Sequence, residues 1–317
     1  MAESRVLFAV LDWGLGHATR CVPLIARLQR EGHEVIIAGA GHSLAWLKLR
    51  FPELKALEKP NAAIRYTRKA NGINIASQMP RFLSNIRKEQ DWTSQMVRKY
   101  RLQGVYSDNC YGVKHPDLPS VFMTHQLHFP VSFLARPAAG WSVKRMVRGF
   151  TSIWVPDLQG EDALAGRLSA PLKGCPITYI GPISQYSEVE ADTLKEAVPN
   201  VAMISGPEPH RTLMEADVIK RFQASGKKSV LFTGKVDATV EVHGKVTVYG
   251  NAPASTIKAH LVQAEQIACR SGYSTVMDLH VLGVIDRVQR WEPTPGQWEQ
   301  EYLAKHLNRR RKSGRRS

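Results

Sequence analysis

The sequence predicts an α/β protein built from two parallel-sheet domains. Short apolar runs alternate with helical patterns along most of the 317 residues, which is typical of parallel strands joined by crossover helices. The hydrophobic content of 43% and the charged content of 22% are ordinary for a globular chain. A Gly-Pro pair at 181–182 and a polar stretch after it separate two sets of strand candidates. We therefore expect one domain over residues 1–182 and a second over residues 183–307.

The strand candidates are short apolar runs. Those of the first domain are residues 6–11, 35–38, 105–107, 121–124, 153–155 and 177–180. Those of the second domain are residues 201–205, 230–233, 246–249 and 267–269, with helices expected at residues 212–223, 256–264 and 275–282. Ligands of such sheets bind beyond the carboxyl ends of the strands, so the loops at those ends are where a site is expected.

The first of these loops carries two glycines between a strand and a helix. Gly14 and Gly16 follow the run at residues 6–11, and a helical pattern continues from Ala18. Glycines let the backbone approach a ligand, and the N–H groups at a helix start attract phosphate, which predicts an anion site. A nicotinamide dinucleotide is not expected, because Thr19 stands where that fingerprint needs a third glycine. A turn without a ligand is the alternative interpretation.

Similar loops follow strands of the second domain. Ser205, Gly206 and Arg211 follow one strand, and residues 270–275 follow another. Phosphate-type loops in both domains predict a ligand clamped between them.

Taken together, these residues resemble the GT-B glycosyltransferases. The resemblance is carried by residues 269–278 and 293–302 in the second domain, and by residues 14–17 in the first. Within this group the chain resembles the peptidoglycan N-acetylglucosaminyltransferases and a set of uncharacterised bacterial homologues. The resemblance implies two Rossmann-like domains that face a cleft. It also implies inverting, metal-independent transfer of a hexose or N-acetylhexosamine from a UDP-sugar, with no further cofactor.

Under this resemblance the loops would neutralise the leaving diphosphate without a metal. Backbone N–H groups at Gly14, Gly16, Ser271 and Gly272 are expected to donate to it, together with a helix N-terminus and the Arg211 side chain. Arg270 and Thr275 flank the second loop and are expected to contact the same ligand.

Four further side chains are assigned to the nucleotide sugar. Asp278, one turn into the helix after the second loop, is expected to accept hydrogen bonds from ribose hydroxyls, with a surface carboxylate as the alternative. By resemblance, Gln297, Gln300 and Glu301 are expected to bind sugar hydroxyls.

The catalytic group is expected at the strand ends of the first domain. His17 is expected to contact the diphosphate or the acceptor hydroxyl, with a helix-capping role as the alternative. Asp12, Asp108 and His125 all stand at strand ends and are candidate general bases, of which Asp12 is preferred. No metal site is expected, since His125 and His128 have no third ligand and the cysteines form no close pair.

The formal net charge of +15 predicts an anionic partner. Six of the positive charges lie within residues 308–317, which are expected to form a disordered basic tail: Arg309, Arg310, Arg311, Lys312, Arg315 and Arg316. The partners expected are a nucleotide-sugar donor, an acceptor for which a lipid-linked sugar is one option, and an anionic membrane surface. Basic residues interleaved with aromatic ones in the first domain predict that surface: Phe82, Trp92, Trp141 and Phe150. No specific nucleic acid is expected.

The expected location is the cytoplasm, with peripheral association at the inner face of the membrane. The first residues lack a signal-peptide core, and no apolar run reaches bilayer-spanning length. Four scattered cysteines fit a reducing compartment.

One segment departs from the family pattern. Residues 284–292 carry Asp286, Arg287, Arg290 and Glu292 where the relatives have a short apolar strand. Buried parallel strands are normally continuous apolar runs, so we expect a distorted or looped segment here, a less stable second domain and a displaced sugar site. A bulged strand with its charges at the ends is the alternative.

Two other functions share these features. A UDP-sugar epimerase would use the same loops without an acceptor, and a degenerate relative would bind the nucleotide sugar without chemistry. Product analysis distinguishes these two from a glycosyltransferase, because an epimerase changes the sugar and a binding protein forms no product.

Overall fold

The computed structural model describes residues 4–61, 72–194, 196–235 and 239–314. The chain divides into two compact units, Met1–Gly181 and Pro182–Ser317. The division falls at the Gly-Pro pair at which the sequence places the domain boundary.

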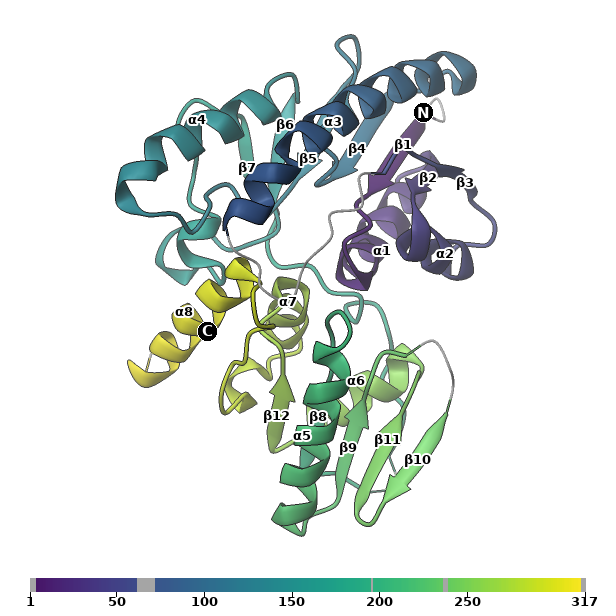
Figure 1. Ribbon diagram of the computed structural model, residues 1–317. Coiled ribbons are helices and arrows are strands. Elements are labelled where there is room, and N and C mark those ends of the chain that lie inside the picture. The colour runs from purple at the N-terminus through teal and green to yellow at the C-terminus, as the bar shows by residue number, and fades with distance from the viewer. Residues whose placement is uncertain (1–3, 62–71, 195, 236–238, 315–317) are drawn as a thin grey trace. The chain divides into compact units, whose positions relative to one another are not determined.

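The first unit is built on a seven-stranded parallel sheet with the order β3-β2-β1-β4-β5-β6-β7 (Figure 1). Its strands are β1 (Arg5–Val10), β2 (Glu34–Gly39), β3 (Lys55–Glu58), β4 (Gly104–Asp108), β5 (Ser120–Met123), β6 (Ser152–Val155) and β7 (Ile177–Tyr179). Its helices are α1 (Leu15–Arg30), α2 (Gly41–Arg50), α3 (Gly72–Tyr100) and α4 (Arg136–Val147), with 3-10 turns η1 (Phe133–Ala135), η2 (Gly160–Asp162) and η3 (Gly166–Leu168). All six strands expected in this half are present.

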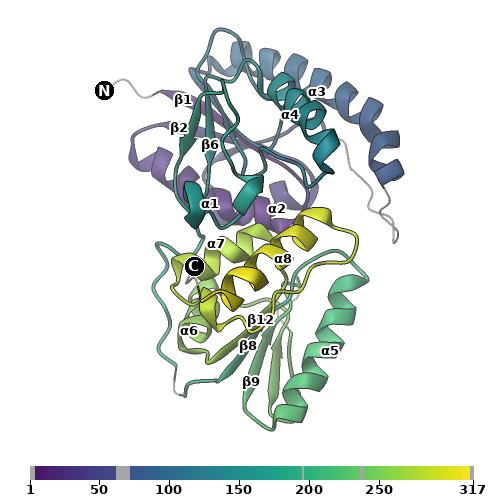
Figure 2. The same ribbon diagram turned by 90° about the vertical axis from the view of Figure 1, so that its left-hand side faces the viewer.

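Side chains on one face of this sheet form two core clusters, one under α3 and one under α4. The register pairs Leu7 with Val105 and Ser107 with Phe122, so these positions share a face. Trp92, Met96 and Val97 of α3 pack on one part of that face, and Val143 and Val147 of α4 pack on another. Figure 2 shows both helices on the same side of the sheet.

A buried ion pair ties the edge of this sheet to α3. Lys59, just after β3, donates to Glu89 of α3 at 2.8 Å, and the two side chains are 0% and 3% exposed. Glu89 also accepts the N–H of Gly112 at 3.1 Å. Burial acts to lower the pKa of Lys59, but Cys110 and Glu89 beside it raise that pKa above its ordinary value. The pair therefore holds the loop after β4 against α3.

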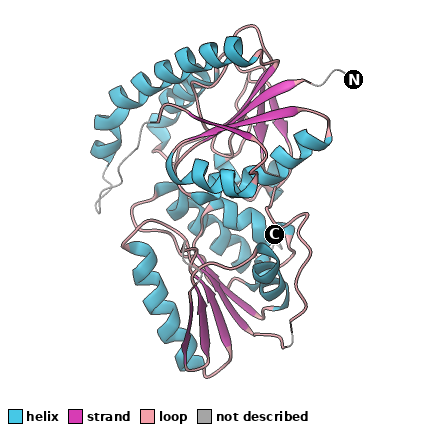
Figure 3. Cartoon of the chain, turned by 90° about the vertical axis from the view of Figure 1, so that its right-hand side faces the viewer, coloured by secondary structure: helices cyan, strands magenta, loops and turns pink. Residues whose placement is uncertain are grey.

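The second unit is built on a five-stranded sheet with the order β10-β11-β9-β8-β12. Its strands are β8 (Asn200–Met203), β9 (Ser229–Phe232), β10 (Val240–His243), β11 (Val246–Tyr249) and β12 (Gln266–Cys269), of which β10 alone among the described strands is antiparallel. Its helices are α5 (His210–Ser225), α6 (Ala254–Gln263), α7 (Tyr273–Val281) and α8 (Trp298–Lys312), with a 3-10 turn η4 (Ile285–Arg287). Figure 3 shows helices flanking the strands in each unit.

Residues 284–292 form a loop beside β12, as expected from their charges. They contain η4 and only isolated parallel bridges, Ile267 to Val288 and Arg270 to Glu292. Val288 and Trp291 are buried, while Asp286 and Arg290 are exposed. Arg287 donates to the carbonyls of Val262 and Ala264 at 2.9 and 2.6 Å, and Glu292 pairs with Arg221. The segment thus fills the core without burying an unpaired charge. The expected loss of stability stays a prediction.

The expectation of a disordered tail from residue 308 is wrong for residues 308–312, which lie in α8. Arg310 is 8% exposed, and Arg311 donates to Gln289. Long arginine stems pack along apolar surface, and cations suit the last turn of a helix, so this basic run extends α8. No helix in the described part of the chain is long and apolar enough to cross a membrane.

Candidate active site

The carboxyl ends of β1 and β4 bring the candidate catalytic residues together. These strands are neighbours in the sheet, and Val10 lies opposite Asp108 in the register. The glycine loop after β1 leads directly into α1, whose first turn holds His17. Arg20 follows one turn later on the same helix face. His17, Arg20 and Asp108 therefore meet although 91 residues separate His17 from Asp108.

These three side chains form a compact charged cluster. The Nδ1 atom of His17 lies 2.7 Å from Oδ2 of Asp108, and Arg20 donates to Oδ1 of Asp108 at 2.5 Å. Arg20 and Asp108 are buried, whereas 19% of the His17 side chain is exposed. Burial raises the pKa of Asp108, but Arg20 and His17 outweigh it and hold that pKa below its ordinary value. Asp108 is thus a carboxylate at neutral pH.

The carboxylate fixes the orientation of the histidine ring. A carboxylate has no proton to give, so its hydrogen bond with His17 requires the hydrogen on Nδ1. The 2.8 Å contact from Arg20 to the same nitrogen is then close packing between two donors. In the neutral ring the lone pair is on Nε2, which is the arrangement of a general base oriented by a buried carboxylate.

Asp12, the residue preferred as base from the sequence, has structural partners instead. Its Oδ1 accepts the N–H of Ser43 at the start of α2 at 3.1 Å, and its Oδ2 accepts from Asn61 at 3.3 Å. A carboxylate is well placed at a helix N-terminus because the N–H groups there lack internal partners. Asp12 therefore holds α2 against the loop after β1, and the histidine cluster has the geometry expected of a base.

Gly41 makes that contact possible, which gives a testable expectation. Its φ is +47°, and a Cβ here would lie 2.3 Å from Oδ2 of Asp12. We expect Gly41→Ala to lower the free energy of unfolding by about 2 kcal/mol, since strain and a clash act together.

The matched control for this substitution is Gly32→Ala. Gly32 has a φ of +84°, and an alanine Cβ at this position would meet nothing within 4 Å. It carries the backbone strain alone and should cost about 1 kcal/mol. Equal losses for the two variants in urea unfolding would contradict the contact between Asp12 and α2.

The first loop of the second unit is organised by its own ion pair. Gly206, after Ser205, has a φ of +115°, a conformation that favours glycine. Glu208 accepts from Arg211 at 2.6 Å and from the hydroxyl of Thr212 at 2.8 Å. Hydrogen bonds from Thr212 and Arg211 lower the pKa of Glu208. Arg211, predicted to meet the diphosphate, thus pairs with a carboxylate at the start of α5.

The second loop is more buried than its predicted role requires. Arg270 is 7% exposed and donates to the carbonyls of Pro293 and His210 at 2.5 and 3.1 Å. Ser271 gives its N–H to Glu292 and its hydroxyl to the Gln300 carbonyl. The Ser271 N–H is therefore not available to a diphosphate, which corrects that expectation.

The start of α7 keeps the character of an anion site. Gly272 is its N-cap, and the side chain of Thr275 is buried in the first turn. The first N–H groups of a helix point along its axis away from the helix body, so Gly272 remains the predicted point of contact.

Asp278 is an interior residue, so the alternative of a surface carboxylate is wrong, and its contact with a ribose stays a prediction. It is 6% exposed and accepts the hydroxyl of Ser184 at 2.5 Å. Burial raises its pKa to about 7, against hydrogen bonds from Ser184 and Gln185 that act to lower it. The side chain fastens the segment that opens the second unit onto α7.

Gln297, Gln300 and Glu301 organise the turn before α8. Gln300 accepts the Thr294 N–H at 2.8 Å and donates to Gln297 at 2.6 Å, and Glu301 accepts the Gly296 N–H at 3.2 Å. These half-buried side chains tie the turn of residues 293–297 to the start of α8. Their predicted sugar contacts are untested.

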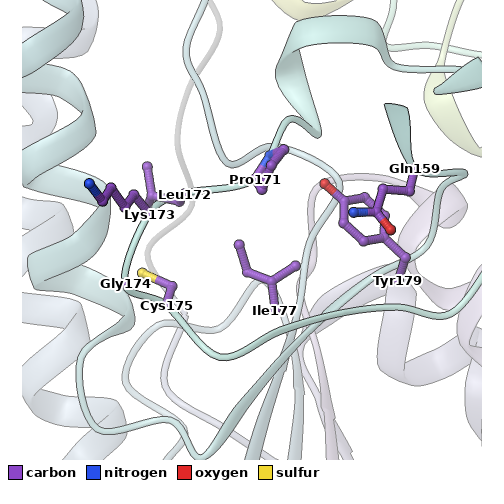
Figure 4. Close-up of a pocket in the computed structure, with 8 residues that line it drawn as sticks. All are labelled: Gln159, Pro171, Leu172, Lys173, Gly174, Cys175, Ile177 and Tyr179. Carbon is purple, nitrogen blue, oxygen red and sulfur yellow. The ribbon is translucent and has the colours of Figure 1, made fainter. Parts of the chain in front are cut away.

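A separate hollow of about 450 Å³ lies beside the edge strand β7 of the first unit (Figure 4). Its lining is Gln159, Pro171, Leu172, Lys173, Gly174, Cys175, Ile177 and Tyr179. None of the site residues predicted from the sequence lines it, so it is not part of the candidate site.

Comparison with known proteins identifies the fold. No protein-family model and no curated protein matches the chain. Among solved structures, the glycotransferase of kitacinnamycin aligns with a TM-score of 0.65 and 16% identity, covering 97% of this chain and 84% of its own. MurG of Acinetobacter baumannii aligns at 0.53 and 12%, covering 96% and 83%. A putative UDP-N-acetylglucosamine 2-epimerase from Listeria monocytogenes aligns at 0.58 and 11%, covering 99% and 90%.

Two further neighbours were solved with a nucleotide. The glycosyltransferase VinC and the spinosyn rhamnosyltransferase SpnG are both complexes with thymidine diphosphate. At such low identity these matches establish architecture. The chain has the GT-B fold, with two Rossmann-like units, as the sequence predicts.

Proposed function

We propose that this protein is a glycosyltransferase that moves a sugar from a nucleotide diphosphate donor to an acceptor hydroxyl, with His17 as the general base. The observation that carries the proposal is the buried Asp108 carboxylate at 2.7 Å from Nδ1 of His17. Without His17, the ion pair between Arg20 and Asp108 would have a structural role alone. A partly exposed imidazole held in one tautomer at the ligand-binding edge of a parallel sheet suits proton transfer.

In the proposed reaction Nε2 of His17 takes the proton of the acceptor hydroxyl as that oxygen attacks the anomeric carbon. The bond to the diphosphate breaks on the opposite face of the sugar, so the configuration inverts. Asp108 stabilises the imidazolium that forms, and Arg20 keeps Asp108 ionised. Direct attack assisted by one base forms no covalent intermediate, which is why we propose inversion.

The departing diphosphate needs positive partners. We propose that N–H groups at Gly14, Gly16 and Gly272 supply them at the starts of α1 and α7, without a metal. Gly14 has a φ of +109° and open space around it, which leaves room for a close approach by a ligand.

We propose a UDP-sugar as the donor, carrying a hexose or an N-acetylhexosamine, on the resemblance of residues 269–278 and 293–302 described above. VinC and SpnG were solved with thymidine diphosphate, so a thymidine nucleotide is the second donor to be tested against the uridine nucleotides. We propose a cytoplasmic enzyme that works at a membrane face, for which a lipid-linked acceptor is suited.

The experiment that tests this function is a thermal-shift panel followed by product analysis. The panel contains UDP, UDP-N-acetylglucosamine, UDP-glucose and dTDP-glucose, with NAD as the control nucleotide. A ligand at a hundredfold excess over its Kd stabilises the folded state by about 2.7 kcal/mol. We expect the uridine nucleotides to raise the melting temperature and NAD to leave it unchanged. No shift with any of the uridine and thymidine nucleotides in the panel would overturn the proposal.

Product analysis separates the competing functions. Transfer releases UDP and yields a new glycoside, whereas an epimerase converts the sugar at C2, as the name of the Listeria neighbour indicates for that protein. A shift without turnover with any acceptor tested would favour a nucleotide-sugar binding protein.

A further inference from the structure

The stretch that includes η1 and α4 has an unusual charge pattern. No Asp or Glu occurs from residue 118 to residue 156, while Arg136, Lys144 and Arg145 fall within α4. None of these three cations forms an ion pair with any residue that the structure describes. An anionic partner would therefore meet no carboxylate of this stretch.

The same elements expose large apolar side chains. Phe133 is 75% exposed, Leu134 is 88% exposed and Trp141 is 65% exposed. Residues 132–138 are exposed without interruption, while Val143 and Val147 anchor the opposite face of α4 in the core. Trp141 therefore stands on a helix that is fixed to the sheet, and Phe133 and Leu134 stand on the 3-10 turn that leads into that helix.

Cations and apolar groups are interleaved on this surface. The Arg136 guanidinium lies 5.4 Å from the Phe133 ring centroid, and that of Arg145 lies 5.9 Å from the Trp141 ring centroid. Of the four aromatic residues linked to a membrane in the sequence, Trp141 is exposed. Phe150 is buried, and Trp92 packs on the core.

We propose that the η1–α4 surface, made of Phe133, Leu134, Arg136, Trp141, Lys144 and Arg145, docks the protein onto an anionic lipid bilayer. Charge complementarity selects this occupant. Interfacial helices combine basic residues with bulky apolar ones, so that the apolar side chains enter the acyl boundary while the cations meet headgroup phosphates. The inference deepens the membrane location that the proposed function includes, and it is separate from the proposed chemistry because none of these residues belongs to the candidate active site.

The test is sedimentation of the full-length protein with vesicles of phosphatidylcholine alone and of phosphatidylcholine mixed with phosphatidylglycerol. We expect binding to the mixed vesicles, weakened by salt, and little binding to the neutral ones. F133S/L134S/W141S and R136Q/K144Q/R145Q should each weaken binding by at least about tenfold.

Two control variants test whether the loss of binding is specific to this surface or follows from removing any exposed apolar or basic side chains. L49S/L213S removes leucines that are 82% and 62% exposed on α2 and α5, and K48Q/K220Q removes exposed cations of the same two helices. Both should bind like the wild type. Circular dichroism melts establish that every variant is folded.

Three results would overturn the proposal. One is a wild type that does not sediment with the mixed vesicles. Another is equal loss of binding in the control variants. The third is a dimer by light scattering that F133S/L134S/W141S makes monomeric while vesicle binding is absent, which would assign the surface to a second copy of the chain.

Discussion

His17→Ala is expected to lower kcat for sugar transfer by about 10²–10⁴-fold, the usual contribution of a general base. The Kd for the donor nucleotide should change little, because the imidazole acts on the acceptor proton. Asp108→Asn should also lower kcat, since the amide can place an N–H donor against Nδ1 and favour the wrong tautomer. Single-turnover measurements with a saturating donor would separate this chemistry from binding.

Asp12→Asn is the matched control for the assignment of the base. An asparagine oxygen can still accept the Ser43 N–H, so α2 keeps its cap. We expect this variant to retain most of the activity. A variant of Asp12 that is as inactive as His17→Ala, with both proteins folded, would return the role of base to Asp12.

The second large effect concerns pH and Asp278. The pKa of this carboxyl rises from 3.8 to about 7 on folding, so the folded state holds its proton more tightly than the unfolded chain. Its contribution to stability is fully present below about pH 4 and is lost as the pH rises through 7. Asp278→Asn cannot ionise and still accepts the Ser184 hydroxyl. We expect it to be more stable than the wild type at pH 8 by on the order of 2–4 kcal/mol.

Urea unfolding of the full-length protein at pH 4 and at pH 8 measures this difference. The two proteins should nearly converge at pH 4, where the folded carboxyl is protonated and that of the unfolded chain is only partly ionised, so little of the difference remains. Asp286→Asn, an exposed carboxyl on η4, serves as the control and should match the wild type at both values. An Asp278→Asn variant that is less stable at pH 8 would mean that the ionised carboxylate is the form the fold requires.

The fold followed from the sequence wherever apolar runs are continuous. Central strands such as β1 and β9 are buried on both faces and read as uninterrupted hydrophobic segments. The edge strands β3 and β10 were not predicted, because Lys55–Glu58 and Val240–His243 mix charges with partly exposed side chains. Edge strands have one free side, so their composition approaches that of a loop.

The contacts between the candidate site residues could not be predicted from the sequence. Glycine spacing indicates the loop before His17, yet the contact with Asp108 depends on β4 lying next to β1. Two strands intervene in the sequence, and nothing local specifies that order. The pairing of Asp278 with Ser184 is equally non-local, so the burial of this carboxyl could not be predicted from the sequence. Arg20 was not among the predicted site residues, although its position one helical turn after His17 could have indicated that the two side chains lie together.

The ion pair between Lys59 and Glu89 has a consequence for how this protein can evolve. Loss of one partner leaves a buried charge uncompensated and costs about 3–5 kcal/mol, whereas exchange of both for apolar residues is often neutral. Neither position can therefore change freely by single steps. In homologues the two should vary together, as a charged pair or an apolar pair, and sequences with only one of the two charges should be rare.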